Sequence, residues 1–79
     1  MKKFMFVGVA PDVSEDSTRQ ALAPLGPVGE VTILRAGSPE VVLVIAELDV
    51  SDEKAFELIS KPSNPWRDGR RVRVHLMLH

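Results

Sequence analysis

Hydrophobic and polar residues follow a regular spacing in six segments of the chain. Residues 4–9, 30–34, 40–48 and 72–78 alternate with period two or form short apolar runs, which predicts β-strands. Residues 15–23 and 52–60 carry apolar side chains at helical spacing, which predicts two helices. The predicted order is therefore β-α-β-β-α-β.

Local signals set the ends of the first predicted helix. Ser14 is a plausible N-cap, and Glu15 and Asp16 follow it where the helix dipole favours acidic side chains. Pro24 disfavours helical backbone in the residue before it, so the helix is expected to end or kink there. In the second helix, Ala55, Phe56 and Ile59 are expected to form the buried side.

The third predicted strand, EVVLVIAEL, is apolar on both faces. Val42, Val44 and Ala46 point one way, and Val41, Leu43 and Ile45 point the other. The turn at residues 36–39 makes this strand and the one before it an antiparallel hairpin. We predict an α+β, ferredoxin-like sandwich, a four-stranded antiparallel sheet with two helices on one face. Leu43 and Ile45 are expected on its open face.

Length and composition indicate one soluble domain over residues 1–79. Hydrophobic content of 44% with 27% charge is ordinary for a globular protein, so disorder is not expected. The chain has no cysteine, which excludes disulfides and fits a cytoplasmic location. No stretch reaches the roughly 18 apolar residues of a membrane span, so no membrane association is expected.

The charge is distributed unevenly along the chain. Residues 1–60 carry five basic against ten acidic residues, a net −5, whereas residues 61–79 carry five against one, a net +4. The whole surface is therefore not expected to attract nucleic acid, but the carboxyl-terminal end is.

Several motifs together resemble the RNA recognition motif family over nearly the whole chain. They are Met5–Val9 for the shorter signature motif, PLGPVGEVTIL for the helix end and second strand, Ile45–Leu48 for the end of the longer signature motif, DEKAFELI for the second helix and Asp68–Val74 for the last strand. The resemblance implies binding of single-stranded RNA across the open sheet face. It implies that Phe6, and also Phe4, stack on bases beside Leu43 and Ile45, while Arg71, Arg73 and Lys3 neutralise phosphates.

The sequence departs from the family at two positions that bind RNA bases in that family. Leu43 and Ile45 occupy the two positions where the longer signature motif places aromatic residues. Each base–aromatic stack is worth about 1–3 kcal/mol, so RNA binding is expected to be weak or of low specificity. The alternative function is a protein-interaction or homodimerisation module that buries the same face, with Phe4, Phe6, Leu43 and Ile45. A small-ligand regulatory domain of the ACT type shares the topology and is a more distant alternative.

Catalysis has little support in the sequence. There are no cysteines and two histidines, and the acidic pairs at the helix starts are explained by the helix dipole. We expect no enzymatic activity, no cofactor and no metal. Trp66, the single tryptophan, either packs on the core beside Phe56 or anchors a nucleotide or a partner.

Overall fold

The computed structural model describes residues 1–35, 42–60 and 64–77. Its elements are β1 (Lys2–Val7), α1 (Glu15–Leu22), the 3₁₀ turn η1 (Ala23–Leu25), β2 (Val28–Arg35), β3 (Val42–Leu48), α2 (Asp52–Ser60) and β4 (Arg73–Met77). The predicted order of strands and helices is confirmed.

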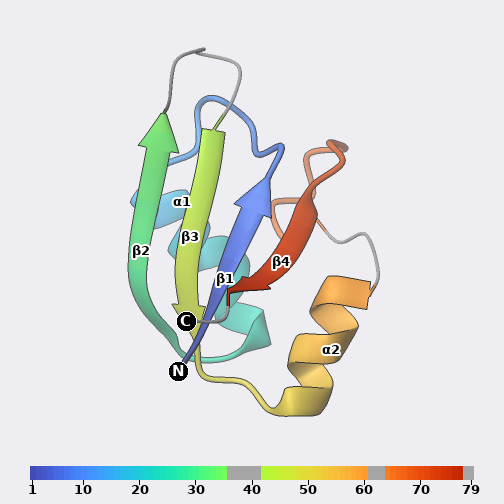
Figure 1. Cartoon of the computed structure of the whole chain (residues 1–79). Helices are drawn as coiled ribbons and strands as arrows, with labels where there is room; N and C mark the ends of the chain where they lie inside the picture. The colour runs from blue at the N-terminus through green and yellow to red at the C-terminus, as the bar shows by residue number, and fades with distance from the viewer. Residues whose placement is uncertain (36–41, 61–63, 78–79) are drawn as a thin grey trace.

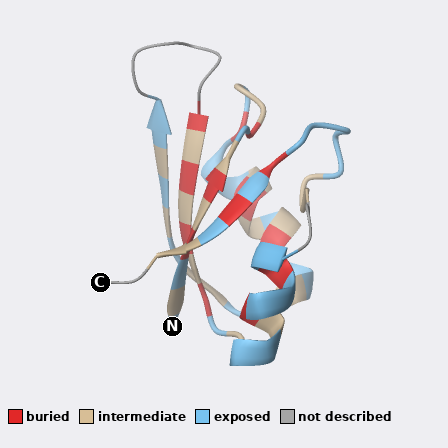
Figure 2. Cartoon of the chain, turned by 45° about the vertical axis from the view of Figure 1, so that its right-hand side comes forward, coloured by how far each residue is buried: buried red, intermediate tan, exposed pale blue. Residues whose placement is uncertain are grey.

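The described strands form one antiparallel sheet in the order β2-β3-β1-β4. Both helices lie on the same side of this sheet, where α1 packs against β2 and α2 against β4 (Figure 1). The view turned by 45° shows the opposite side of the sheet bare of helices (Figure 2). This is the predicted ferredoxin-like arrangement with one open face.

The element bounds follow the local sequence signals closely. The helix α2 spans the predicted residues 52–60, and α1 ends just before Pro24, which lies in η1. The strand β1 ends earlier than predicted because Gly8 has a φ of 93°, a left-handed conformation that stops a strand. The predicted turn at 36–39, the first two residues of the predicted third strand, residues 61–63 of the loop before the last strand, and Leu78 lie outside the described residues.

Two serines fix the start of α1. The backbone N–H of Ser17 donates to Oγ of Ser14, and the backbone N–H of Ser14 donates to Oγ of Ser17. This reciprocal capping box satisfies two helix-end donors, and it confirms Ser14 as the N-cap. Buried Thr18 also donates its hydroxyl to the carbonyl of Ser14, at 2.8 Å.

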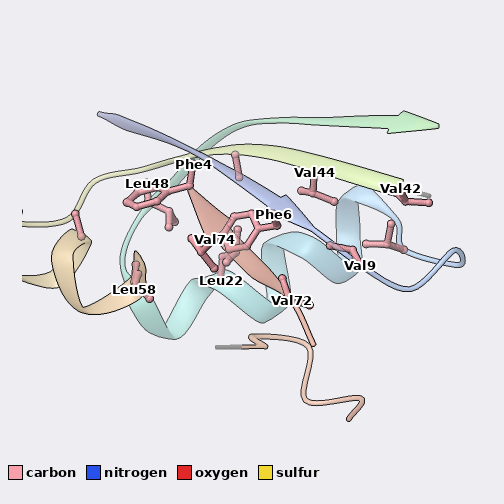
Figure 3. Packing of buried hydrophobic residues seen from close by; sticks show 13 residues of the cluster. Phe4, Phe6, Val9, Leu22, Val42, Val44, Leu48, Leu58, Val72 and Val74 are labelled. Carbon is pink, nitrogen blue, oxygen red and sulfur yellow. The ribbon is translucent and has the colours of Figure 1, made fainter. Parts of the chain in front are cut away.

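The hydrophobic core lies between the sheet and the two helices (Figure 3). It is composed of Phe4, Phe6, Val9, Val13, Leu22, Val42, Val44, Ala46, Leu48, Ala55, Leu58, Val72 and Val74. The prediction for the buried side of α2 is only partly right. Ala55 is buried, but its buried neighbour is Leu58, whereas Phe56 and Ile59 are 67% and 39% exposed. Ala55 and Leu58, three residues apart, are the pair that α2 turns towards the sheet.

Candidate functional site

The open face of the sheet is the candidate site. Cross-strand pairing arranges its side chains in rows that run from β2 to β4. One row contains Leu34, Leu43, Val7 and Arg73, the next contains Thr32, Ile45, Met5 and His75, and the third contains Glu47, Lys3 and Met77.

The structure contradicts the predicted place of Phe4 and Phe6. Both side chains are 0% exposed and belong to the core on the helix side of the sheet. Phe4 pairs with Ala46 and Phe6 with Val44, so the two rings share the face of the buried half of β3. Neither ring can stack on a base at the open face, and the role assigned to them was wrong.

The reason for this error is the two-residue period of a strand. Shifting an assignment by one residue moves every side chain to the other face. The two phenylalanine rings bury more apolar surface than Met5 and Val7 would, and they therefore occupy the side that the helices cover. Met5 and Val7 lie on the open face instead, beside Ile45 and Leu43. Neither residue was predicted as a site residue.

The centre of the open face is aliphatic. The predicted placement of Leu43 and Ile45 on this face is confirmed. They form a patch with Met5, Val7 and Leu34, which we call the aliphatic patch; Leu34 is 42% exposed and the other four are partly buried. Among residues 1–35, 42–60 and 64–77, neither phenylalanine nor tryptophan lies on the open face, and the imidazole of His75 is the one aromatic ring there.

Polar side chains flank the aliphatic patch on the β4 side. Arg73 and His75 are exposed, and they pair across the strands with Val7 and Met5. Lys3 is also exposed on this face, one row further along. It pairs with Glu47, however, so an acidic neighbour opposes its positive charge.

The basic charge continues from β4 into the chain segment before it. Arg67, Arg70, Arg71 and Arg73 are all exposed, and we call residues 67–73 the arginine segment. Within the described part of the chain, the ion pairs join Lys2 to Asp52, Arg19 to Glu15 and Lys54 to Glu57, and none includes these four arginines. Buried Val72 and Val74 alternate with Arg71 and Arg73, and this alternation turns both arginines outward.

A close backbone approach holds the arginine segment against the end of β1. A Cβ atom at Gly8 would lie 2.6 Å from the carbonyl oxygen of Arg71, well inside van der Waals contact. Glycine is therefore required at this position both for its φ of 93° and for space. This role of Gly8 was not predicted. A glycine directly after an apolar strand is the signal that could have found it.

Residues 1–35, 42–60 and 64–77 contain no group of three or more His, Asp or Glu side chains placed to hold a metal ion. In the same residues, no helix has the length and apolar character needed to cross a membrane.

Comparison with known proteins establishes the fold. No protein-family model matches this chain, and no curated protein matches it. Among solved structures, the chain is similar to the crystal structure of RNA binding protein PG1, with a TM-score of 0.69 and 15% sequence identity. The similarity covers 100% of this chain and 96% of the other. At this identity the two proteins share a fold over their whole length.

Proposed function

We propose that this chain is a divergent module of the RNA recognition motif type that binds single-stranded RNA weakly and with low sequence specificity. The observation that carries the proposal is the position of exposed Arg71 and Arg73, free of ion pairs in the described structure, at the β4 side of the open sheet face. Arg67 and Arg70 precede them in the loop, where Arg67 lines a pocket with Gln20 of α1. The fold shared with RNA binding protein PG1 supports it.

Electrostatic contact with phosphates supplies most of the affinity in this proposal. Arg71 and Arg73 are the part of the arginine segment that adjoins the open face. An RNA strand that crosses the sheet towards β4 therefore reaches both. Guanidinium groups bind phosphate oxygens through two parallel hydrogen bonds. Lys3 contributes less because Glu47 lies opposite to it.

The aliphatic patch explains why the binding is weak. Val7, Leu43 and Ile45 cover bases and riboses through van der Waals contact, but they have no π face for stacking. A missing aromatic platform costs about 1–3 kcal/mol per base. The burial of Phe4 and Phe6 removes from the face the last two stacking residues that the sequence suggested.

Fluorescence anisotropy with a labelled random single-stranded RNA decamer tests the proposal. The double variant Arg71→Gln and Arg73→Gln should bind more weakly, and its plot of log K against log salt should flatten by about 0.7 for each phosphate that is no longer bound. Arg19→Gln is the control, because Arg19 lies on α1 and pairs with Glu15. Equal losses of affinity from all these substitutions, or an affinity independent of salt, would contradict the proposed interface.

A second candidate function is supported by the aliphatic patch itself. Five neighbouring aliphatic side chains on an open face form a surface that a protein partner or a second copy of the chain would bury. Leu43→Asp would then abolish self-association or a partner complex while the monomer stays folded. Sedimentation velocity over a wide range of protein concentration distinguishes the two functions. A monomer at every concentration favours RNA binding over homodimerisation.

A further inference from the structure

One side chain organises the loop that carries most of the arginine segment. Nδ2 of Asn64 donates to the carboxylate of Asp68 and to the backbone carbonyl of Arg70, the latter at 2.9 Å. Its Oδ1 accepts the backbone N–H of Trp66, also at 2.9 Å. The backbone carbonyl of Asn64 accepts the N–H of Arg67 at 3.0 Å. Asn64 therefore fixes the backbone on both sides of Arg67.

Asp68 completes this network from the opposite side of the loop. Its carboxylate accepts the backbone N–H of Arg70 at 3.1 Å in addition to the Asn64 amide. The hydrogen bond from the Asn64 side chain, followed by that from the Arg70 backbone, lowers the pKa of the Asp68 carboxyl below its ordinary value. Asp68 is thus a negative charge in the middle of a basic segment.

A negative charge at this place is unexpected in a surface that binds phosphates. Coulomb repulsion alone predicts that Asp68 weakens the attraction of RNA to Arg67 and Arg70. The carboxylate forms no ion pair in the described structure, and both of its hydrogen bonds hold the loop. Any favourable effect of Asp68 on RNA binding must therefore come from these hydrogen bonds, which order the loop.

The core fixes the same loop at a third point. Trp66 is half-buried and its ring meets the buried ring of Phe6 edge to face, with centroids 5.5 Å apart. The backbone between Asn64 and Arg70 is therefore held by the core on one side and by the Asn64–Asp68 network on the other.

We propose that Asn64 and Asp68 are positioning residues that hold the backbone of Arg67 and Arg70 ready for phosphates of bound RNA. The inference rests on the proposed RNA binding and extends it from the sheet to this loop. Ordering flexible side chains and loops on binding costs free energy, and a loop that is ordered in advance avoids part of this cost. The hydrogen bonds of Asp68 then favour RNA binding, although its negative charge opposes it.

Two substitutions of Asp68 separate order from charge. Asp68→Asn and Asp68→Ala remove the same charge, but only asparagine keeps an oxygen that accepts from Arg70 and Asn64. Asp68→Ala should bind the RNA decamer about 3- to 10-fold more weakly than Asp68→Asn, which should bind at least as tightly as the unchanged chain. Asn64→Ala changes no charge, and it should bind the RNA decamer more weakly than the unchanged chain by a similar factor.

The salt dependence shows whether the effect is one of positioning. A loop that no longer presents its arginines binds fewer phosphates, so the salt slope of Asp68→Ala should be shallower than that of Asp68→Asn by about 0.7 for each phosphate left unbound. A decrease in stability alone would leave the slope of the folded protein unchanged. Circular dichroism confirms that each variant is folded at the temperature of the assay.

The possible results also separate this inference from the proposed function. If the unchanged chain binds the decamer and the two Asp68 variants bind it equally tightly, the positioning role is wrong and RNA binding stands. If the unchanged chain does not bind RNA at low salt, the proposed function fails, and the inference fails with it. A weaker Asp68→Ala with a shallower slope supports both.

Discussion

The rings of Phe6 and Trp66 meet edge to face, with a centroid distance of 5.5 Å and an interplanar angle of 89°. Phe6 lies next to the end of β1, an inner strand of the sheet, and Trp66 lies in the loop before β4. The contact therefore connects an inner strand of the sheet to the loop that carries Arg67 and Arg70. A residue expected to stack on RNA is instead part of the support for the basic surface.

This contact makes Phe6 a stability residue. Phe6→Leu should lower the free energy of unfolding by about 1–2 kcal/mol, because it removes the aromatic pair and leaves the core imperfectly filled. Urea unfolding followed by Trp66 fluorescence measures the effect. Phe56→Leu makes the same change at a ring that is 67% exposed and should cost under about 0.5 kcal/mol. Equal effects at the two positions would contradict the burial of Phe6.

The approach of Arg71 to Gly8 gives a second stability prediction. Gly8 and Gly69 both have positive φ, 93° and 82°, but a Cβ atom at Gly69 would meet nothing within 4 Å. Gly69→Ala should therefore cost about 1 kcal/mol from backbone strain alone, and Gly8→Ala should cost at least about 1 kcal/mol more. Thermal unfolding of both variants measures the difference. Similar melting temperatures would show that Arg71 does not pack closely on β1.

The backbone of Arg67 predicts a separation of stability from binding. Its φ of 55° is left-handed, a conformation that asparagine tolerates better than arginine does. Arg67→Asn should leave the free energy of unfolding unchanged or raise it by up to about 1 kcal/mol, yet flatten the salt slope of RNA binding by about 0.7. Chemical unfolding and anisotropy measure the two effects. An unchanged salt slope would exclude Arg67 from the RNA interface.

The hydrogen bonds to Asp68 predict its titration. The pKa of its carboxyl should lie below the ordinary value, and Asn64→Ala should raise it towards that value, because the Asn64 amide is the main cause of the shift. A depressed pKa in the folded state stabilises the protein above the pKa of the unfolded state. This contribution disappears as the pH falls through the folded pKa. Carboxyl NMR titration of the two proteins measures the shift, and identical pKa values would contradict the hydrogen bond from Asn64.

The sequence alone predicts the order of elements because each element has its own local signals. The serine N-cap, the proline at the end of the first helix and the apolar run of β3 all act over a few residues. The placement of Leu43 and Ile45 is also predictable, since Glu47 has the same parity in the strand and marks the solvent side.

The same reasoning does not show which side chains of β1 face the helices and which lie on the open face. Both sets of alternating residues are apolar, and a lysine lies at the start of each set. Lys2 has the parity of the buried Phe4 and Phe6, and it is accommodated because its Nζ reaches the carbonyl of Val50 and the carboxylate of Asp52 at the edge. Lys3 lies on the open face, but the sequence alone does not show that Lys3, and not Lys2, marks the solvent side of β1. The size of the two phenylalanine rings is the better guide.

The loop network was missed for a different reason. The sequence of residues 61–69 is rich in helix and strand breakers and therefore indicates only a loop. In an Asx-turn, the side-chain oxygen of an asparagine accepts a hydrogen bond from the backbone N–H two residues later. Asn64 and Trp66 have this spacing and form this hydrogen bond. The contact of Trp66 with Phe6 joins residues that are far apart in the chain, and only the fold brings them together.

An amide NMR titration with the single-stranded RNA decamer at low and moderate salt tests the central claim most directly. RNA binding through the proposed interface predicts salt-sensitive shifts at Val7, Leu43, Arg71 and Arg73, with α2 unchanged. Shifts confined to α2 would contradict this interface, because RNA would then bind on the helix side. No shifts, with line broadening that grows with protein concentration, would also contradict it and would favour self-association.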